Sequence, residues 1–183
     1  MQIVVANSKG GCGKSTLVMA LADVLDAQIV DHDLQGTIRK TAHYSGRHRP
    51  IGAQDFSKKF LLHDTPPYNS GTYKSLLDIA DLVLIPVKLA HADLLAVQGI
   101  VDQLRDLNQT HKGRIIFNEV RKPDTRVQRK LRAYFSQNYM DITKVNTELS
   151  FLSGFRDIME TPVYGAARKE IAALLQELGI LYT

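Results

Sequence analysis

Apolar and polar positions alternate along the chain with two different periods. Short apolar runs rich in β-branched residues predict strands, and they cover residues 2–6, 28–33, 58–67, 81–87 and 113–120. Segments with apolar residues three or four positions apart predict amphipathic helices, and they cover residues 15–27, 73–80, 91–108, 125–137 and 164–178. Residues 35–57 have weak periodicity, which predicts a short helix and a loop.

Buried strands that alternate with amphipathic helices predict an α/β fold, with a mostly parallel, twisted sheet and helices on both of its faces. Ligands of such sheets bind at the carboxyl ends of the strands, and Lys9, Asp33 and Asp64 all fall at such ends. A chain of 183 residues supports one well-buried core. We therefore expect a single domain over residues 1–183, with its site at this edge of the sheet.

The stretch NSKGGCGKSTL, residues 7–17, lies between the first strand and the first helix. Its glycines let the backbone point successive N–H groups into a concave nest, and the following helix presents its positive N-terminus to the same anion. Such a loop binds a di- or triphosphate, with Lys14 neutralising the outer phosphates and the Ser15 hydroxyl ligating Mg²⁺. The candidate nucleotide contacts in the loop are Gly10, Gly11, Cys12, Gly13, Lys14, Ser15 and Thr16.

A second lysine, Lys9, precedes the glycines, and Ser8 occupies the position where the general P-loop pattern has its first glycine. The sequence K-G-G-x-G-K-[ST]-[ST] resembles the deviant Walker A motif of the ParA/MinD superfamily of P-loop NTPases. Further segments resemble that superfamily at residues 30–36, where Leu34 replaces the usual proline, and at residues 61–67, 82–100 and 155–178. The chain looks most like small ParA-type partition ATPases without an N-terminal helix-turn-helix.

The resemblance implies an ATPase that uses ATP and Mg²⁺. Lys9 is expected to reach across a nucleotide-sandwich homodimer to the partner's phosphates, so Lys9, Lys14 and Asp33 are the catalytic candidates. Asp33 matches the family position that orients the attacking water, and Asp64 is expected to hold Mg²⁺ in partnership with Ser15. The resemblance also implies a ParB-like, centromere-binding adaptor that stimulates slow hydrolysis.

Three other residues near these positions have two interpretations each. Asn118 ends a predicted strand and either contacts adenine or caps the following loop. Cys12 lies at a helix N-terminus, which favours a reactive thiolate, but a lone thiol without a resolving partner is better explained as a small residue that fills the loop. His63 lies beside Asp64, yet an alternating strand directs it to the opposite face, and we interpret it as structural.

The distribution of charge suggests a partner. The net charge is +4, but residues 111–132 hold eight Lys and Arg against two acids, a local +6, which leaves −2 for the rest of the chain. Such a segment either follows a DNA backbone without reading bases or forms a solvated helix face. The resemblance favours nonspecific DNA binding by the ATP dimer, and the candidate residues are Arg121, Lys122, Arg126, Arg129, Lys130 and Arg132.

The single cysteine and the N-terminal residues bear on the compartment. One cysteine excludes an internal disulfide and a Cys-rich metal site, and it suits a reducing compartment. The N-terminal residues have no secretory leader. We therefore expect a cytoplasmic, nucleoid-associated protein.

Three alternative functions use the same kind of loop. A MinD-like regulator that cycles on membranes needs a basic amphipathic anchor, and residues 171–183 contain no Lys or Arg, so we expect no membrane partner. A small-molecule ATP-dependent ligase of the dethiobiotin-synthetase kind is disfavoured by Lys9. A ParA-like ATPase that positions another cargo is not distinguished from a partition ATPase by the sequence.

Overall fold

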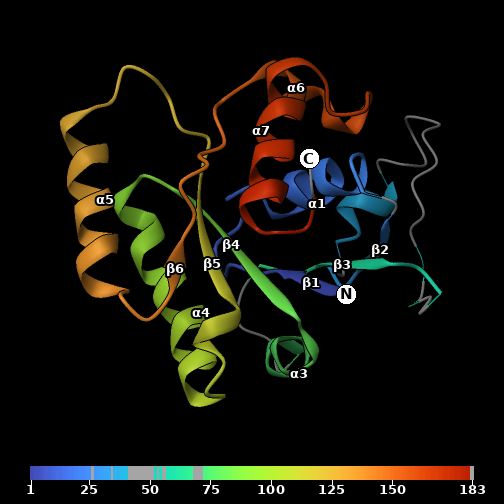
Figure 1. Cartoon of the computed structure of the whole chain (residues 1–183), viewed down its shortest axis with the longest axis horizontal. Coiled ribbons are helices and arrows are strands. Elements are labelled where there is room, and N and C mark those ends of the chain that lie inside the picture. The colour runs from blue at the N-terminus through green and yellow to red at the C-terminus, as the bar shows by residue number, and fades with distance from the viewer. Residues whose placement is uncertain are drawn as a thin grey trace.

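The computed structural model contains a parallel sheet with helices on both faces, which confirms the predicted fold class (Figure 1). It describes residues 1–25, 27–33, 35–40, 52, 54, 57–67 and 72–181. In this part of the chain six strands pair in the order β2-β3-β1-β4-β5-β6, and every pair is parallel. The strands are β1 (Gln2–Val5), β2 (Ala27–Asp31), β3 (Phe60–Asp64), β4 (Leu82–Lys88), β5 (Gly113–Asn118) and β6 (Thr143–Lys144).

The described helices, apart from the short α6, lie close to their predicted positions. They are α1 (Lys14–Ala22), α3 (Thr72–Ile79), α4 (Leu94–Asp106), α5 (Arg126–Asn138), α6 (Ser153–Arg156) and α7 (Gly165–Glu177). The described residues also form the 3₁₀ turns η1 (His91–Asp93), η2 (Thr110–Lys112) and η3 (Asp157–Met159). None of the described helices combines the length and the apolar character that crossing a bilayer requires.

The differences from the prediction concern short elements. The predicted helix over 91–108 is divided into η1 and α4. Strand β6 and helix α6 were not predicted, because elements of two and four residues are too short to show a hydrophobic period. Within 35–57, residues 37–40 are helical, and most of the predicted loop lies outside the described residues.

The alternation of side chains along each strand sorts the core onto the two faces of the sheet. Ile3 and Val5 belong to one buried cluster, which includes the apolar residues of α1 and α7. Val4 belongs to a second cluster, which includes those of α3 and α4. Figure 1 shows α6 and α7 above the sheet and α3 and α4 below it. Both faces are therefore covered, as a parallel sheet requires.

The pairing of the strands brings three chain segments to one carboxyl edge. β1 pairs with β3 in a register that places Val5 beside Asp64, and β2 pairs with β3 so that Asp31 also lies beside Asp64. The loop that leaves β1 therefore starts next to two acids from different strands. The strand order reverses at β1, which lies between β3 and β4, and parallel sheets bind ligands at such a switch point.

Candidate functional site

The loop between β1 and α1 curves tightly because two of its glycines adopt left-handed backbone angles. Gly11 has φ 72° and Gly13 has φ 96°, values that favour glycine. Gly13 has a second constraint, because a Cβ at that position would lie 2.1 Å from Asn118 Nδ2. A side chain at Gly13 would therefore disturb both the loop and the end of β5.

A hollow of about 290 Å³ opens in front of this loop. The loop glycines and the first turn of α1, with Lys14, line one side of it, and Asp33 beyond β2 and Thr65 beyond β3 line the other. Lys14 is buried, and its Nζ donates to the Lys9 carbonyl at 3.0 Å. The free N–H groups at the start of α1 and the Lys14 ammonium give the hollow the character of a phosphate site.

Asp64 at the end of β3 contacts the first turn of α1. The Ser15 hydroxyl donates to Asp64 Oδ2 at 2.7 Å, while the buried Oδ1 has no hydrogen-bond partner among the described residues. Burial raises the pKa of this carboxyl to about 7, the bond from Ser15 opposes the shift, and the charges of Asp31 and Asp33 add to it. A buried acid among other acids, with one oxygen unpaired, is a position where a cation is favourable.

These oxygens fit Mg²⁺. The ion keeps several waters and is bound through one or two protein oxygens together with the phosphates of its nucleotide. Ser15 Oγ, which lines the phosphate hollow, and the Asp64 carboxylate directly behind it meet that requirement. The described residues contain no group of three His, Cys, Asp or Glu that could hold a metal, so a cation here depends on oxygens from the nucleotide.

Asp33 is held at the wall of the hollow by the turn that follows β2. The Gln35 N–H donates to Asp33 Oδ1 at 2.9 Å, and the Asp33 N–H donates to Asp31 Oδ1 at 3.0 Å. This local network is typical of Asp in turns, and it fixes the position of the carboxylate. The structure therefore brings the loop glycines, Lys14, Ser15 and Asp33 together around one hollow, and Asp64 reaches it only through its contact with Ser15.

Lys9 lies on the other side of the loop and does not line the hollow. Its Nζ is 2.7 Å from Asp93 Oδ2 in η1; Asp93 is fully buried, and the Lys9 side chain is 33% exposed. The Ser8 hydroxyl donates to the Ala96 carbonyl of α4 at 3.1 Å and fixes the same stretch. The sequence did not indicate this ion pair, because Asp93 lies 84 positions away in a helix that was predicted from its apolar residues alone.

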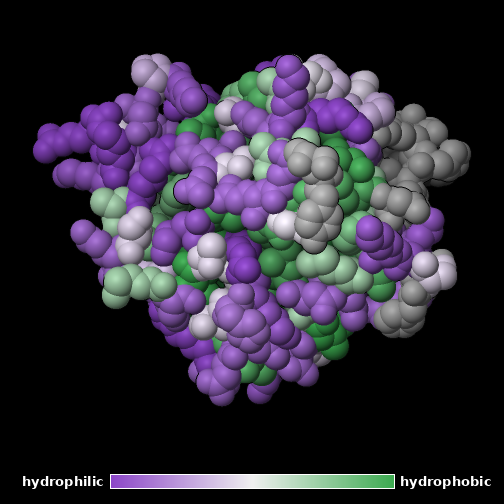
Figure 2. All heavy atoms as spheres, in the orientation of Figure 1, coloured by the Kyte–Doolittle hydropathy of each residue, from purple (hydrophilic) through white to green (hydrophobic). Residues whose placement is uncertain are grey.

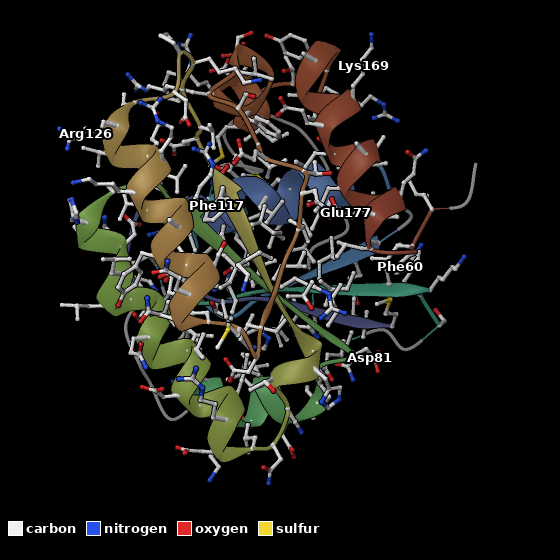
Figure 3. The ribbon with its side chains drawn as sticks, turned by 60° about the vertical axis from the view of Figure 1, so that its left-hand side comes forward. Phe60, Asp81, Phe117, Arg126, Lys169 and Glu177 are labelled. Carbon is white, nitrogen blue, oxygen red and sulfur yellow. The ribbon has the colours of Figure 1, made fainter. Side chains whose placement is uncertain are left out.

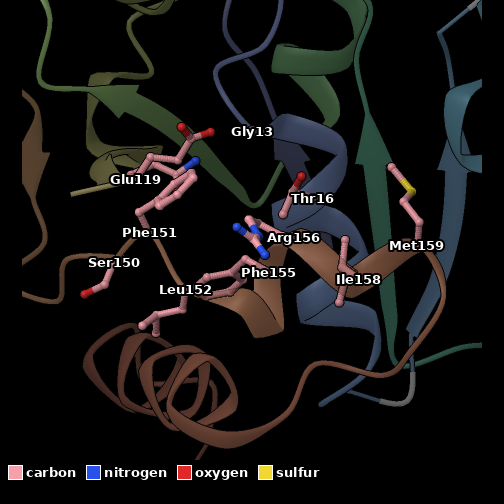
Figure 4. A pocket seen from close by; sticks show the side chains of 11 residues that line it. Gly13, Thr16, Glu119, Ser150, Phe151, Leu152, Phe155, Arg156, Ile158 and Met159 are labelled. Carbon is pink, nitrogen blue, oxygen red and sulfur yellow. The ribbon is translucent and has the colours of Figure 1, made fainter. Parts of the chain in front are cut away.

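A second cavity, of about 140 Å³, adjoins the hollow at Gly13 and Thr16 (Figure 4). Most of its wall comes from residues 150–159 and is apolar. Asn118 also lines it, and Asn118 Nδ2 donates to the Cys12 carbonyl at 2.8 Å. Since a carbonyl can only accept, this bond fixes the orientation of the amide and leaves Oδ1 as an acceptor for a ligand. The bond to the phosphate loop was part of neither interpretation of Asn118.

Sequence reasoning missed the residues of the apolar wall. Phe151, Phe155 and Arg156 line the cavity, but they occur in a segment whose short elements, α6 and η3, show no periodic pattern. The only sequence signal was the resemblance of residues 155–178 to the closing segment of the superfamily, and it identified no contacts.

Cys12 and His63 have surroundings that support their structural interpretation. Cys12 is fully buried, and burial raises the pKa of its thiol, which opposes thiolate formation. The buried His63 ring donates to Gln2 Oε1 at 3.1 Å and accepts from His32 Nε2 at 2.9 Å. Burial, and then the neighbouring His32, lower the pKa of His63 to about 4.

Two of the six predicted DNA contacts have an ion-pair or aromatic partner within the chain. Arg132 pairs with Glu148 at 2.6 Å and with Asp124 at 2.7 Å, so its charge is neutralised. Arg121 lies over the Phe151 ring, 4.3 Å from the ring centroid. The basic segment therefore presents less free charge than its composition suggests.

The other four predicted DNA contacts, Lys122, Arg126, Arg129 and Lys130, are exposed. Arg129 Nη1 donates to the Asp124 carbonyl at 3.0 Å, which neutralises no charge. Figure 3 shows Arg126 pointing away from the first turn of α5. In Figure 2 hydrophilic side chains project from the edge of the molecule where Figure 1 shows α5.

The family model for the CobQ/CobB/MinD/ParA nucleotide binding domain matches residues 3–157. No curated protein matches the chain in sequence. Among solved structures, a putative plasmid partition protein from Borrelia burgdorferi B31 bound to AMPPNP is similar with a TM-score of 0.77 and 16% identity, over 97% of both chains.

Two further structures have the same fold. The ATP complex of a McdA variant from Cyanothece has a TM-score of 0.72 and 12% identity, over 100% of this chain and 97% of that one. Cobyrinic acid a,c-diamide synthase from Mycobacterium smegmatis, with bound ADP and magnesium, has a TM-score of 0.67 and 16% identity, over 97% of this chain and 95% of that one. At these identities the likeness shows the fold, and the activity must be argued from the site.

The raised pKa of Asp64 predicts how pH changes stability in the absence of nucleotide and metal. The pKa of Asp64 is about 7 in the folded chain, against an ordinary value of 3.8. Protonation of the carboxyl therefore favours folding fully below pH 3.8, and this contribution is lost as pH rises through 7. Asp64→Asn removes the titration. The variant should gain stability relative to wild type between pH 5.5 and 8.5, by up to about 2 kcal/mol, measured by urea unfolding.

Asp106→Asn, which removes an exposed carboxyl from α4, is the matched control and should differ from wild type equally at both pH values. A stability difference between Asp64→Asn and wild type that is the same at pH 5.5 and 8.5 would contradict the raised pKa.

Proposed function

The chain belongs to the CobQ/CobB/MinD/ParA nucleotide binding domain family, and we propose that it is a ParA-type ATPase that dimerises when ATP is bound. In this proposal residues 1–183 form one ATPase domain. The ATP dimer binds nonspecific DNA, which places it on the nucleoid, and a ParB-like adaptor stimulates its slow hydrolysis. The cycle segregates plasmid or chromosomal DNA.

ATP is the nucleotide that suits the two adjoining cavities. The triphosphate lies against the loop glycines and Lys14, and the base enters the apolar cavity. There Asn118 Oδ1 is an acceptor, because Nδ2 is bonded to the Cys12 carbonyl. An acceptor suits the amino group of adenine and repels the oxygen that guanine carries at the same place. The AMPPNP, ATP and ADP in structures of the same fold support this assignment.

Hydrolysis requires charge neutralisation and a positioned water. Ser15 and Asp64 would hold Mg²⁺, which would supply positive charge at the phosphates. Asp33, fixed by the turn after β2, accepts a hydrogen bond from the attacking water and orients it. Lys14 neutralises the outer phosphates of the same chain.

The observation that carries the proposal is the separation of the two lysines. Lys14 lines the phosphate hollow, whereas Lys9 lies outside it with its ammonium at Asp93. A partly exposed cation that serves no phosphate of its own chain is available to the phosphates of a second copy. When the Lys9 ammonium moves to the phosphates of the second copy, the fully buried Asp93 loses its ion pair. Leaving a buried carboxylate unpaired costs free energy. Dimerisation therefore needs the compensating charge of bound nucleotide, which explains its dependence on ATP.

The exposed cations of the basic segment support DNA binding. Arg126, Arg129 and Lys130 lie within the first turns of α5, where they can contact successive phosphates. Arg132 instead stabilises the fold through Glu148 and Asp124. A dimer presents two such patches to one DNA molecule, and the second patch binds at a high effective concentration once the first is bound. Since ATP drives dimerisation in this proposal, DNA affinity is higher in the ATP-bound state.

The solved structures of the same fold do not distinguish between possible cargoes. A plasmid partition protein and McdA support partition or the positioning of another cargo, and a diamide synthase has the same fold. Lys9 favours the dimerising ATPases over a ligase of the dethiobiotin-synthetase kind. A MinD-like regulator is the remaining alternative within the family.

The role of Lys9 between subunits can be tested in a background without its ion pair. Lys9→Ala alone leaves a buried unpaired carboxylate, so we compare Asp93→Asn with the double variant Lys9→Ala/Asp93→Asn. With AMPPNP and Mg²⁺, Asp93→Asn should sediment as a dimer. The double variant should bind nucleotide but dimerise at least about 100-fold more weakly, because a dimer loses two charged hydrogen bonds of roughly 1.5–3 kcal/mol each.

Analytical ultracentrifugation and nucleotide titration measure the two properties separately. Equal dimerisation of the two variants would show that Lys9 does not act between subunits. Failure of wild type to bind any nucleotide would remove the ATPase proposal altogether.

DNA binding is tested with two double variants that remove the same charge. Arg126→Ala/Lys130→Ala changes the exposed face of α5, and Arg168→Ala/Lys169→Ala changes α7. The α5 variant should bind random-sequence DNA about tenfold more weakly in the ATP state, with a shallower dependence on salt. The α7 variant should match wild type in fluorescence anisotropy. Equal losses in the two variants would indicate a general charge effect and would count against α5 as the DNA site.

A further inference from the structure

The wall of the apolar cavity includes a cation, Arg156, that has no role in the nucleotide site proposed above. Arg156 is the only Lys or Arg among the described residues that line it. The one acid of that wall, Glu119, already pairs with Lys88 at 2.7 Å. The Arg156 guanidinium has no ion pair with an acid in the described part of the chain. Its charge therefore remains available to a ligand of the cavity.

The position of Arg156 is fixed by tight packing of α6 on α7. A Cβ on Gly154 would lie 2.7 Å from the Tyr164 carbonyl oxygen and 2.9 Å from Ala167 Cβ, so the two helices touch where Gly154 has no side chain. The Arg156 N–H donates to the Leu152 carbonyl at 3.3 Å. A short but closely packed helix therefore presents the guanidinium to the cavity.

The two cavities indicate which part of a nucleotide meets Arg156. They share Gly13, Thr16, Glu119 and Met159, and a nucleotide that spans both must place its α-phosphate at this junction, because that group links the ribose to the outer phosphates. Figure 4 shows the Arg156 guanidinium between Thr16 and Phe155. We propose that Arg156 binds the α-phosphate of the nucleotide held by its own chain; this contact rests on the proposed ATPase function.

The chemistry of the wall supports a phosphate contact in preference to a base contact. Phe151, Leu152 and Phe155 already provide apolar surface for a base. A guanidinium adds planar donors that match two phosphate oxygens at once. Arg156 thereby differs from Lys14, which serves the outer phosphates, and from Lys9, which is assigned to a partner. Because adenosine monophosphate has an α-phosphate, the contact is made in every phosphorylated state of the nucleotide.

The proposal is tested by the affinities of wild type and Arg156→Ala for adenosine, AMP and ADP, measured by calorimetry at constant ionic strength. Arg156→Ala should bind AMP and ADP about tenfold more weakly, the effect of one charged hydrogen bond, and should bind adenosine as wild type does. Arg156→Lys keeps the charge but loses the planar donors, so its affinities for AMP and ADP should lie between those of wild type and Arg156→Ala.

Lys169→Ala removes an exposed cation from α7 (Figure 3) and should leave all three affinities unchanged. Wild-type affinity of Arg156→Ala for AMP and ADP would overturn the α-phosphate contact and leave the ATPase proposal intact. An equal loss for adenosine would also overturn it, in favour of stacking on the base. Absence of ADP binding by wild type itself would overturn the proposed function as well.

Discussion

The parallel pairing of β1 with β3 is the constraint on which the site depends. It places Val5 beside Asp64, so the glycine-rich loop and the Asp64 carboxylate lie at the same edge of the sheet. The first turn of α1 then brings Ser15 to Asp64 at 2.7 Å, although the two residues are 49 positions apart. The pKa of Asp64 is raised because the sheet buries this acid beside others. The fold thus bears an electrostatic cost at the place where a cation and a polyphosphate restore the balance of charge.

The curvature of the phosphate loop separates two similar side chains into two roles. Left-handed glycines turn the backbone so that Lys14 lines the hollow while Lys9 faces α4 and its preceding turn. Lys14 is buried against the loop carbonyl of Lys9, and the Lys9 ammonium contacts a buried acid. One loop can therefore serve the nucleotide of its own chain and, in the proposed dimer, that of a second copy. In the proposed dimer, breaking the ion pair between Lys9 and Asp93 is the free-energy cost of moving Lys9 to the nucleotide of the second copy.

The basic segment illustrates the difference between composition and available charge. Its local +6 includes Arg132, which two acids neutralise, and Arg121, which covers the Phe151 ring. Phe151 also lines the apolar cavity that we assign to the base. The segment therefore contains residues that stabilise the fold, a residue that packs on the wall of the nucleotide site, and the free cations at the start of α5. The proposed DNA surface and the proposed nucleotide cavity are adjacent because the backbone of Val120 pairs with that of Ser150.

The sequence by itself determined the α/β class, five of the strands, the main helices and the phosphate loop, because each of these depends on local periodicity or on glycine spacing. It also predicted that Ser15 and Asp64 serve one site, since parallel strands share a carboxyl edge. Only the tertiary structure revealed the ion pair of Lys9 with Asp93 and the wall that contains Arg156. Both depend on contacts between segments that are distant in the chain and lack a period of their own. Local pattern is fixed by neighbouring residues, whereas the partner of a charge is decided by the packing of the whole fold.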